Sequence, residues 1–260
     1  MKQYKFSNSD HWQQTLIDNN FNDFNSIWDL KTEWFEAPNI RRGGWSGVIK
    51  IDINTPQDKV GIFIKRQENH LTKTVLHPIK GEPTFEREFN NILRLRKNNI
   101  PTLEPVYFAK RNQDGNHQAI LITKELAGYI PLESERFLTT GDLIKDKAHK
   151  VRLFKAVAET IRAMHHHHFQ HNCLFLKHLF IKPDGDSWDV KIIDLEKLKK
   201  TIFKRSAVHR DLYTLSRHAE GWPIKDRVKF FQAYVQEEKL SNKSKNLWRA
   251  VARKILRKPR

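Results

Sequence analysis

Histidine, cysteine and aspartate side chains gather in one short part of the sequence, between residues 169 and 196. His171, Cys173 and His178 follow one another closely, and a mostly apolar run then leads to Asp194. A polar loop followed by a strand that delivers an aspartate is the arrangement with which phosphoryl transfer positions a nucleophile and a metal ion. The spacing therefore predicts a phosphoryl-transfer site built on these four residues.

The same four residues can be compared with the catalytic-loop pattern H-R-D-x-x-x-x-N, in which the Asp is the base and the Asn binds metal. His171 takes the first position, Cys173 falls where the base belongs, and His178 falls where the Asn belongs. Asp194 then stands where an aspartate would bind magnesium. We therefore expect His171 and Cys173 among the catalytic residues, and His178 and Asp194 as metal ligands.

Phosphoryl transfer also needs a loop over the phosphates and a lysine that pairs with them. Gly43, Gly44, Ser46 and Gly47 precede an alternating strand, and glycines let backbone N–H groups approach phosphate oxygens. Lys65 ends the next strand, where a phosphate-pairing and catalytic lysine would sit. We expect all five residues to bind the nucleotide, although glycine clusters are often only turns.

A carboxylate must hold that lysine in place, and two candidates begin the following helix. Glu86 and Glu88 both lie in the first turns of that helix. We favour Glu88 as the partner of Lys65 and as a further residue of the nucleotide site. The alternative is that both acids only complement the positive end of the helix.

Cys173 is the residue at which catalysis is in doubt. A thiol with an ordinary pKa of about 8.5 replaces a carboxylate poorly as the acceptor of the nucleophile's proton. Loss of a general base typically lowers a rate by about 10² to 10⁴. Positioning and charge neutralisation supply most of phosphoryl transfer, so Lys65, His178 and Asp194 can sustain nucleotide binding without it. The proton acceptor is therefore left open among Cys173, a substrate phosphate and solvent.

Two other histidine-containing stretches invite a catalytic or metal-binding interpretation. The triplet that ends at Asp211 spells H-R-D, but no strand-borne aspartate follows it, so we assign Asp211 a structural role in holding the catalytic-loop backbone. The four histidines 165–168 have no partner carboxylates at metal-ligand spacing and are expected to form a helix end.

Apolar periodicity assigns the elements that must position these residues. Strands are predicted at 47–53, 60–65, 106–109, 119–123, 179–181 and 190–193, and helices at 83–97, 150–166 and 224–237. A strand-rich half with one helix, followed by a mainly helical half, indicates an α+β fold with segregated lobes. We divide the chain into a lead-in (1–40), an N-lobe (41–127), a C-lobe (128–241) and a basic amphipathic segment (242–260).

From the glycine loop near Gly43 to about Trp222, these motifs resemble the lipopolysaccharide core kinase (Kdo/WaaP) family, which includes the Kdo and heptose kinases, and especially its InaA-type branch. The most specific string is the catalytic loop at 170–180. The resemblance implies a two-lobed, protein-kinase-like fold that uses ATP and Mg²⁺ to phosphorylate a sugar hydroxyl of the core at the cytoplasmic face of the inner membrane. A metal-binding His178 agrees better with this family than with protein kinases.

The net charge of +17 predicts a surface that attracts polyanions. The apolar residues and basic side chains of 242–260 predict an amphipathic helix, which either lies on an anionic membrane or is an ordinary C-terminal helix. We see no apolar run long enough to span a bilayer and no signal sequence, and the single cysteine fits a reducing compartment. The expected location is the cytoplasm, with peripheral binding to the inner membrane.

Three functions follow from these observations. The first is an ATP-dependent sugar kinase acting on lipopolysaccharide inner core or a related glycolipid. The second is a pseudokinase-type regulator that binds nucleotide or glycolipid, which Cys173 favours. The third is a basic nucleic-acid-binding protein, which rests on charge without a recognised motif. We expect the glycolipid and an anionic membrane surface as partners, and neither nucleic acid nor an obligate protein partner.

Overall fold

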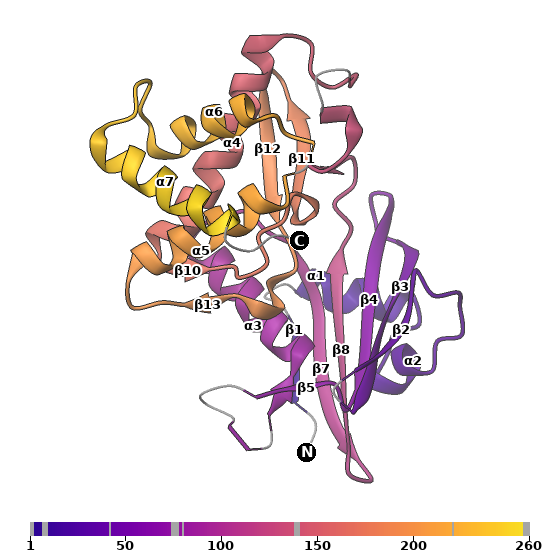
Figure 1. The fold of residues 1–260 in the computed structure, drawn as a ribbon. Coiled ribbons are helices and arrows are strands. Elements are labelled where there is room, and N and C mark those ends of the chain that lie inside the picture. The colour runs from indigo at the N-terminus through magenta and orange to yellow at the C-terminus, as the bar shows by residue number, and fades with distance from the viewer. Residues whose placement is uncertain are drawn as a thin grey trace. The chain divides into compact units, whose positions relative to one another are not determined.

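The structure of the chain is a computed structural model that describes residues 3–6, 10–41, 43–73, 78–79, 81–137, 141–219 and 221–256. It divides into two compact units. Unit 1 comprises Met1–Arg94 and Leu103–Ala127, and unit 2 comprises Leu95–Thr102 and Gly128–Arg260. Unit 1 is rich in strands and unit 2 is mainly helical (Figure 1), as the predicted α+β class requires.

Unit 1 is organised by a six-stranded antiparallel sheet with the order β1-β7-β8-β4-β3-β2. Its strands are β1 (Gln3–Phe6), β2 (Glu36–Arg41), β3 (Gly44–Asn54), β4 (Lys59–Glu68), β7 (Pro105–Gln113) and β8 (Asn116–Lys124). The four central strands were predicted, whereas β1 and β2 at the two edges were not. β1 and all of β2 except Arg41 lie in the segment 1–40, for which the sequence predicted no strand.

Two helices from that segment cover one face of the sheet. They are α1 (Asp10–Asp18) and α2 (Phe24–Trp28), and α2 begins with a capping box formed by Asp23 and Ser26. Trp12 and Ile27 are buried here against alternate residues of the central strands, such as Ile49 and Ile62. The aromatic residues scattered along 10–35 therefore belong to the core of unit 1.

The opposite face carries α3 (Thr84–Lys97), which follows the short strands β5 (Leu71–Thr72) and β6 (Glu82–Pro83). Successive residues of a strand point to opposite faces. Accordingly Tyr107 and Ala109 of β7 join the core with α1 and α2, while Phe108 between them stacks on Phe89 of α3 at 4.8 Å between ring centroids. The predicted helix thus lies on the face of the sheet from which Phe108 points.

Unit 2 has two small sheets, β12-β11-β9 and β10-β13, among its helices. Its strands are β9 (Ile130–Pro131), β10 (Phe169–Gln170), β11 (Leu179–Asp184), β12 (Ser187–Ile192) and β13 (Lys199–Lys200). Its α-helices are α4 (Lys147–His166), α5 (Lys204–Arg217), α6 (Ile224–Val235) and α7 (Asn242–Leu256), and its short 3-10 helices are η1 (Glu135–Phe137), η2 (Leu176–His178) and η3 (Leu195–Lys197). The loop that carries the candidate residues runs from β10 to η2.

The predicted C-terminal helix is present as α7, and its apolar side packs inside unit 2. Val251 is buried, and Trp248 contacts Phe231 of α6 at 5.2 Å between ring centroids. Trp248 and Val251 of α7 thus pack on this chain's own helices, which favours the interpretation as an ordinary C-terminal helix. The last basic residues, 257–260, lie outside the described part of the chain. Within that described part, no helix is both long enough and apolar enough to cross a bilayer.

Candidate active site

Lys65 and Glu88 form an ion pair within unit 1. Lys65 Nζ lies 2.7 Å from Glu88 Oε1, and the two side chains are only 19% and 4% exposed. The other candidate acid, Glu86, pairs instead with Lys110 of β7 at 2.6 Å. The structure thus contains the ion pair that the sequence favoured, and it gives the alternative acid a different partner.

The start of α3 is fixed by a residue two positions after Lys65 on the same face of β4. Gln67 is fully buried, and its Oε1 accepts hydrogen bonds from Thr84 Oγ1 at 2.7 Å and from the Phe85 amide at 2.8 Å. Side-chain acceptors at a helix start satisfy amides that have no partner within the helix. These hydrogen bonds to Gln67 hold the first turn of α3 against β4, and so they fix the position of Glu88 relative to Lys65. Nothing in the local sequence pattern singled out Gln67.

Of the residues predicted to form a glycine loop before the strand, only Gly43 lies in the turn between β2 and β3, whereas Gly44, Ser46 and Gly47 belong to β3 itself. Gly43 adopts a φ of +78° in the turn. A Cβ on Gly44 would come within 2.1 Å of the Glu68 carbonyl oxygen, and one on Gly47 would meet the Trp34 ring at 2.6 Å. Close packing therefore accounts for glycine at positions 44 and 47.

Strand register separates Ser46 from Gly47. Ser46 pairs with Gln67 and Val48 pairs with Lys65, and directly opposed residues project from the same face of a sheet. Ser46 and Val48 therefore share the face that carries Lys65, whereas Gly47 faces Trp34 on the other side. Of the predicted loop residues, Ser46 is the one whose side chain lies on the lysine face.

In unit 2, the backbone of the candidate catalytic loop is held by Asp211 of α5. This carboxylate is completely buried, and it accepts hydrogen bonds from the amides of His171 at 2.7 Å and Asn172 at 2.9 Å. His165 Nε2 lies 3.2 Å from the same carboxylate, while its Nδ1 contacts Tyr234 Oη at 2.9 Å. The structural role predicted for Asp211 is confirmed.

The histidine run at 165–168 is accounted for in the same way. His165 is buried in the Asp211 cluster, α4 ends at His166, and His168 has a φ of +62° just beyond the helix. Among the residues that the structure describes, no group of three or more His, Cys, Asp or Glu side chains is arranged to hold a metal ion. The run is a helix end, as predicted.

His171 uses both ring nitrogens inside unit 2. Nε2 donates to the Ile193 carbonyl at 2.9 Å, and Nδ1 accepts from the Cys173 amide at 3.3 Å. Burial lowers the pKa of His171, although Asp211 opposes the shift. Both nitrogens of this neutral imidazole bind backbone groups. His171 therefore positions the loop, and neither ring nitrogen is available to bind a substrate.

His178 and Asp194 meet across the end of the loop. The His178 Nδ1–H donates to the Cys173 carbonyl at 2.8 Å, so the lone pair of neutral His178 is on Nε2. Nε2 lies 3.2 Å from Asp194 Oδ2. Burial lowers the pKa of His178, although Asp194 opposes the shift. The lowered pKa disfavours a proton on Nε2, between the imidazole and the Asp194 carboxylate.

A divalent cation fits the same two atoms. His178 Nε2 carries a lone pair and lies 3.2 Å from the carboxylate oxygen Oδ2 of Asp194. Both atoms can donate electron pairs to one cation, and a cation shared between them would stabilise their close approach. Asp194 reaches this place with a left-handed backbone, φ +58° and ψ +61°, two residues after the end of β12 and directly before η3. The donor set therefore suits a metal ion, with further positions left for water and phosphate oxygens.

Cys173 lies in the loop beside these groups, half-buried. Burial raises the pKa of its thiol and Asp194 adds to the effect, while Lys197 acts against it. The thiol is therefore mostly protonated near neutral pH, and a protonated thiol accepts no proton from a sugar hydroxyl. The geometry does not turn Cys173 into an activated base.

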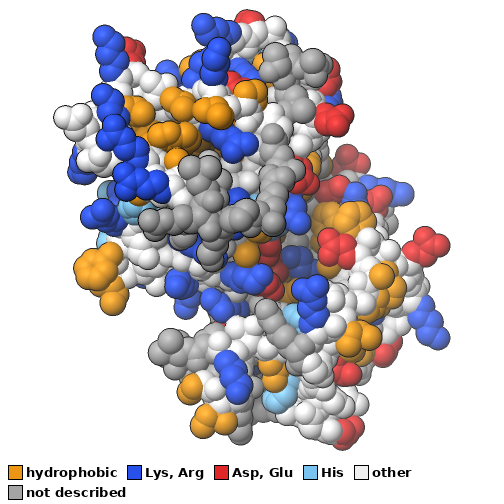
Figure 2. Space-filling view, viewed as in Figure 1, with side chains coloured by type: hydrophobic (Ala, Val, Ile, Leu, Met, Phe, Trp, Pro, Cys, Tyr) orange, Lys and Arg blue, Asp and Glu red, His pale blue; other side chains and the backbone are white. Residues whose placement is uncertain are grey.

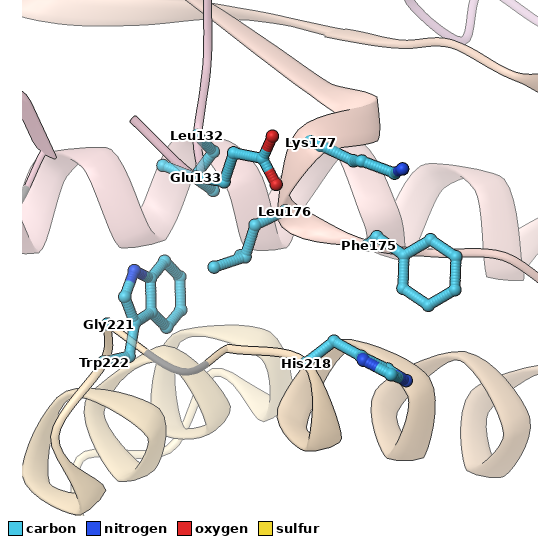
Figure 3. A pocket seen from close by; sticks show the side chains of 8 residues that line it. All are labelled: Leu132, Glu133, Phe175, Leu176, Lys177, His218, Gly221 and Trp222. Atoms are coloured by element: carbon cyan, nitrogen blue, oxygen red, sulfur yellow. The ribbon is translucent and has the colours of Figure 1, made fainter. Parts of the chain in front are cut away.

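A pocket of about 460 Å³ opens beside the catalytic loop within unit 2 (Figure 3). In this view the carboxylate of Glu133 and the indole of Trp222 lie on either side of Leu176. The ring of Phe175 contacts His218 edge-on at 4.8 Å between centroids. Phe175 and Leu176 belong to the predicted catalytic loop at 170–180, whereas no pocket role was predicted for Glu133 or His218, which come from distant segments and share no motif with it. The described residues that line the pocket are Leu132, Glu133, Phe175, Leu176, Lys177, His218, Gly221 and Trp222.

Comparison with known proteins agrees with this geometry. Residues 25–234 match the lipopolysaccharide kinase (Kdo/WaaP) family. Protein InaA of Escherichia coli strain K12 is 29% identical over 206 residues, which cover 79% of this chain and 92% of InaA. The solved structure of WaaP in complex with acyl carrier protein has a TM-score of 0.68 at 19% identity, with 98% of each chain covered. The likeness confirms the predicted kinase-like fold.

Proposed function

The chain belongs to the lipopolysaccharide kinase (Kdo/WaaP) family, and on that premise we propose that it is an ATP-dependent kinase for a sugar of lipopolysaccharide inner core or a related glycolipid. The observation that carries the proposal is the pair of donors on His178 and Asp194, 3.2 Å apart and held by the loop that precedes them. Metal-assisted phosphoryl transfer needs such a pair next to a positioned hydroxyl.

In this proposal the residues of unit 1 hold the nucleotide phosphates. Lys65 pairs with phosphate oxygens and Glu88 keeps its ammonium group in place, as their 2.7 Å contact supports. Gly43 and Ser46 contribute to the part of unit 1 that approaches the phosphates. For Gly44, which packs on the Glu68 backbone, and Gly47, which packs on Trp34, close packing favours a structural role.

The residues of unit 2 hold the metal and the acceptor in this proposal. His178 and Asp194 would hold a divalent metal ion, which would supply positive charge to neutralise the transferring phosphoryl group. His171 and Asp211 act as positioning residues, because both bind the loop backbone. The pocket with Glu133 and Trp222 is the proposed place of the acceptor sugar, since a carboxylate can accept bonds from its hydroxyls and an indole can cover its apolar face.

Cys173 supports a second candidate, a pseudokinase-type regulator that binds nucleotide or glycolipid. Cys173 stands where the proton-accepting carboxylate belongs, and the raised pKa of its thiol keeps it from accepting the proton in place of that carboxylate. In the kinase interpretation, the hydroxyl proton then passes to a substrate phosphate or to solvent, and the reaction is slow. The nucleic-acid interpretation is supported only by the charge of +17.

Partner and location follow as further parts of the proposal. We expect binding at the cytoplasmic face of an inner membrane, and a protein that is stable without an obligate protein partner. WaaP was solved with acyl carrier protein. Size-exclusion chromatography of this chain with and without acyl carrier protein measures whether it forms a similar complex.

Phosphate transfer from Mg-ATP to dephosphorylated lipopolysaccharide core tests the proposal. Transfer by the wild type that disappears in both Lys65→Ala and Asp194→Ala supports a working kinase. If the wild type transfers no phosphate but binds ATP in a Lys65-dependent way, the regulator is the correct function. If ATP does not bind, the kinase is wrong, and so is a regulator that binds nucleotide; only a regulator that binds glycolipid remains.

A further inference from the structure

The segment between β13 and α5 exposes two large apolar side chains next to each other. Ile202 and Phe203 are 85% and 73% exposed. They are adjacent in the chain, whereas a single exposed apolar residue on a surface needs no explanation. This apolar pair lies at the turn that leads from β13 into the first turn of α5.

Basic side chains surround the apolar pair. The exposed cations of this stretch are Lys199, Lys200, Lys204, Arg205 and Arg210. From residue 197 to residue 210 the sequence has no aspartate or glutamate. Figure 2 shows hydrophobic side chains projecting beside Lys, Arg and His side chains at the left edge of the view, where Figure 1 places the connection from β13 to α5.

The backbone on both sides of the pair is anchored within unit 2. The Thr201 amide donates to the His168 carbonyl at 2.8 Å, and the Ile202 carbonyl lies 3.1 Å from His168 Nδ1. Beyond the pair, Ala207 and Val208 of α5 are buried. The exposure of the two side chains is thus a property of a fixed turn.

A hollow of about 540 Å³ adjoins the turn, and basic and polar side chains line it together with Phe203. Lys199, Arg205, His209 and Arg210 contribute to it, with Phe203 at its edge. No acidic side chain lines it. The hollow is large enough for a phosphate headgroup and its donors would neutralise one.

We propose that the β13–α5 surface, defined by Lys199, Lys200, Ile202, Phe203, Lys204, Arg205 and Arg210, binds an anionic lipid bilayer. The apolar pair inserts at the boundary between headgroups and acyl chains, and the cations bind headgroup phosphates, which is the chemistry of interfacial membrane binding. A basic face without exposed apolar groups would fit any polyanion, so the apolar pair is what selects a bilayer. The surface gives a location for membrane binding other than α7, whose Trp248 and Val251 pack inside unit 2.

Co-sedimentation with phosphatidylcholine vesicles, prepared with and without phosphatidylglycerol, measures this binding. We expect wild-type binding only with phosphatidylglycerol, and weaker binding as salt rises because the charges are screened. The combined variant Lys199→Gln, Lys200→Gln and Lys204→Gln should lose about 100-fold in affinity, from about tenfold or less for each cation. The variant Ile202→Ser with Phe203→Ser should lose about tenfold.

Matched control variants distinguish binding by the β13–α5 surface from binding that depends only on the net charge of the protein. Lys243→Gln, Lys245→Gln and Arg249→Gln remove the same charge from the exposed side of α7, and Ile224→Ser removes another exposed apolar side chain. Both controls should bind vesicles as the wild type does. An equal loss in the α7 variant would mean that binding follows net charge and would overturn the proposal.

Two further outcomes bear on the proposal. If the wild type ignores anionic vesicles but the β13–α5 variants lose a complex with a protein such as acyl carrier protein, the occupant is a protein and the lipid proposal is wrong. Lys65→Ala should bind vesicles normally, since vesicle binding requires no nucleotide. Loss of kinase activity and loss of membrane binding are therefore measured separately.

Discussion

His178 donates a hydrogen bond from Nδ1 to the backbone carbonyl of Cys173 at 2.8 Å. The loop residue that lacks a catalytic carboxylate thus still sets the tautomer of the metal-site histidine. Nε2 is left as a donor toward a metal ion, beside the carboxylate of Asp194. The loop can keep its metal-binding geometry after losing its base, because the contact uses backbone atoms of Cys173.

The first prediction concerns the metal that this pair prefers. An imidazole nitrogen is a poorer ligand for Mg²⁺ than for a first-row transition ion, whereas an amide oxygen suits Mg²⁺. His178→Asn should therefore shift the ratio of Mg²⁺ to Mn²⁺ affinity toward Mg²⁺ by about tenfold. Titration of both ions by calorimetry measures the ratio. His166→Asn, which replaces an exposed histidine at the end of α4, is the control; a shift there as large as at position 178 would contradict the assignment.

Nucleotide affinity should distinguish two neighbouring glutamates of α3. Glu88→Gln leaves Lys65 without its partner carboxylate and should weaken ATP binding by about tenfold or more. Glu86→Gln breaks only the pair with Lys110 and should change the affinity little. Fluorescence titration with an ATP analogue measures both. Equal effects of the two variants would show that the charge of α3, and no specific ion pair, controls binding.

Removal of the Asp211 carboxylate should destabilise unit 2 strongly. Asp211→Ala leaves the amides of His171 and Asn172 buried without their acceptor, at a cost of about 3 to 5 kcal/mol. Urea denaturation measures the free energy of unfolding. Asp186→Ala, in the exposed turn between β11 and β12, should change it by less than about 0.5 kcal/mol. A small effect of Asp211→Ala would mean that another group holds the loop.

Because Cys173 is the single cysteine of the chain, thiol alkylation reports on it alone. Only the thiolate reacts, and burial raises the pKa of this thiol. The rate of reaction with iodoacetamide should therefore rise with pH through an inflection above the ordinary value of about 8.5. An inflection below that value would identify an activated thiolate and would make Cys173 a credible base.

The sequence predicted the parts of the fold that local periodicity encodes. The central strands and α3 follow from alternating and helical apolar spacing, and the catalytic loop follows from the order of His171, Cys173 and His178. The edge strand β2 was missed because an exposed edge strand has a weak apolar alternation, and every residue of β2 is exposed.

Other features depend on contacts between distant segments and so left no local signal. The Gln67 bond to the start of α3 joins residues from two elements, and Gly47 is required by Trp34 packing on it. The same limit applies to α7: its amphipathic pattern predicts an apolar face but not what covers it. Ile202 and Phe203 were not singled out, because exposure cannot be read from residue type.

The most direct test of the account is the rate of phosphate transfer by Cys173→Asp compared with the wild type and with Cys173→Ser. If the remaining parts of the kinase site are intact, a carboxylate at position 173 restores the base, and transfer to dephosphorylated lipopolysaccharide core should rise by about 10² or more. Cys173→Ser should show no such gain. A Cys173→Asp protein that folds and binds Mg-ATP but transfers no phosphate would contradict the claim that Cys173 alone separates this chain from an efficient kinase.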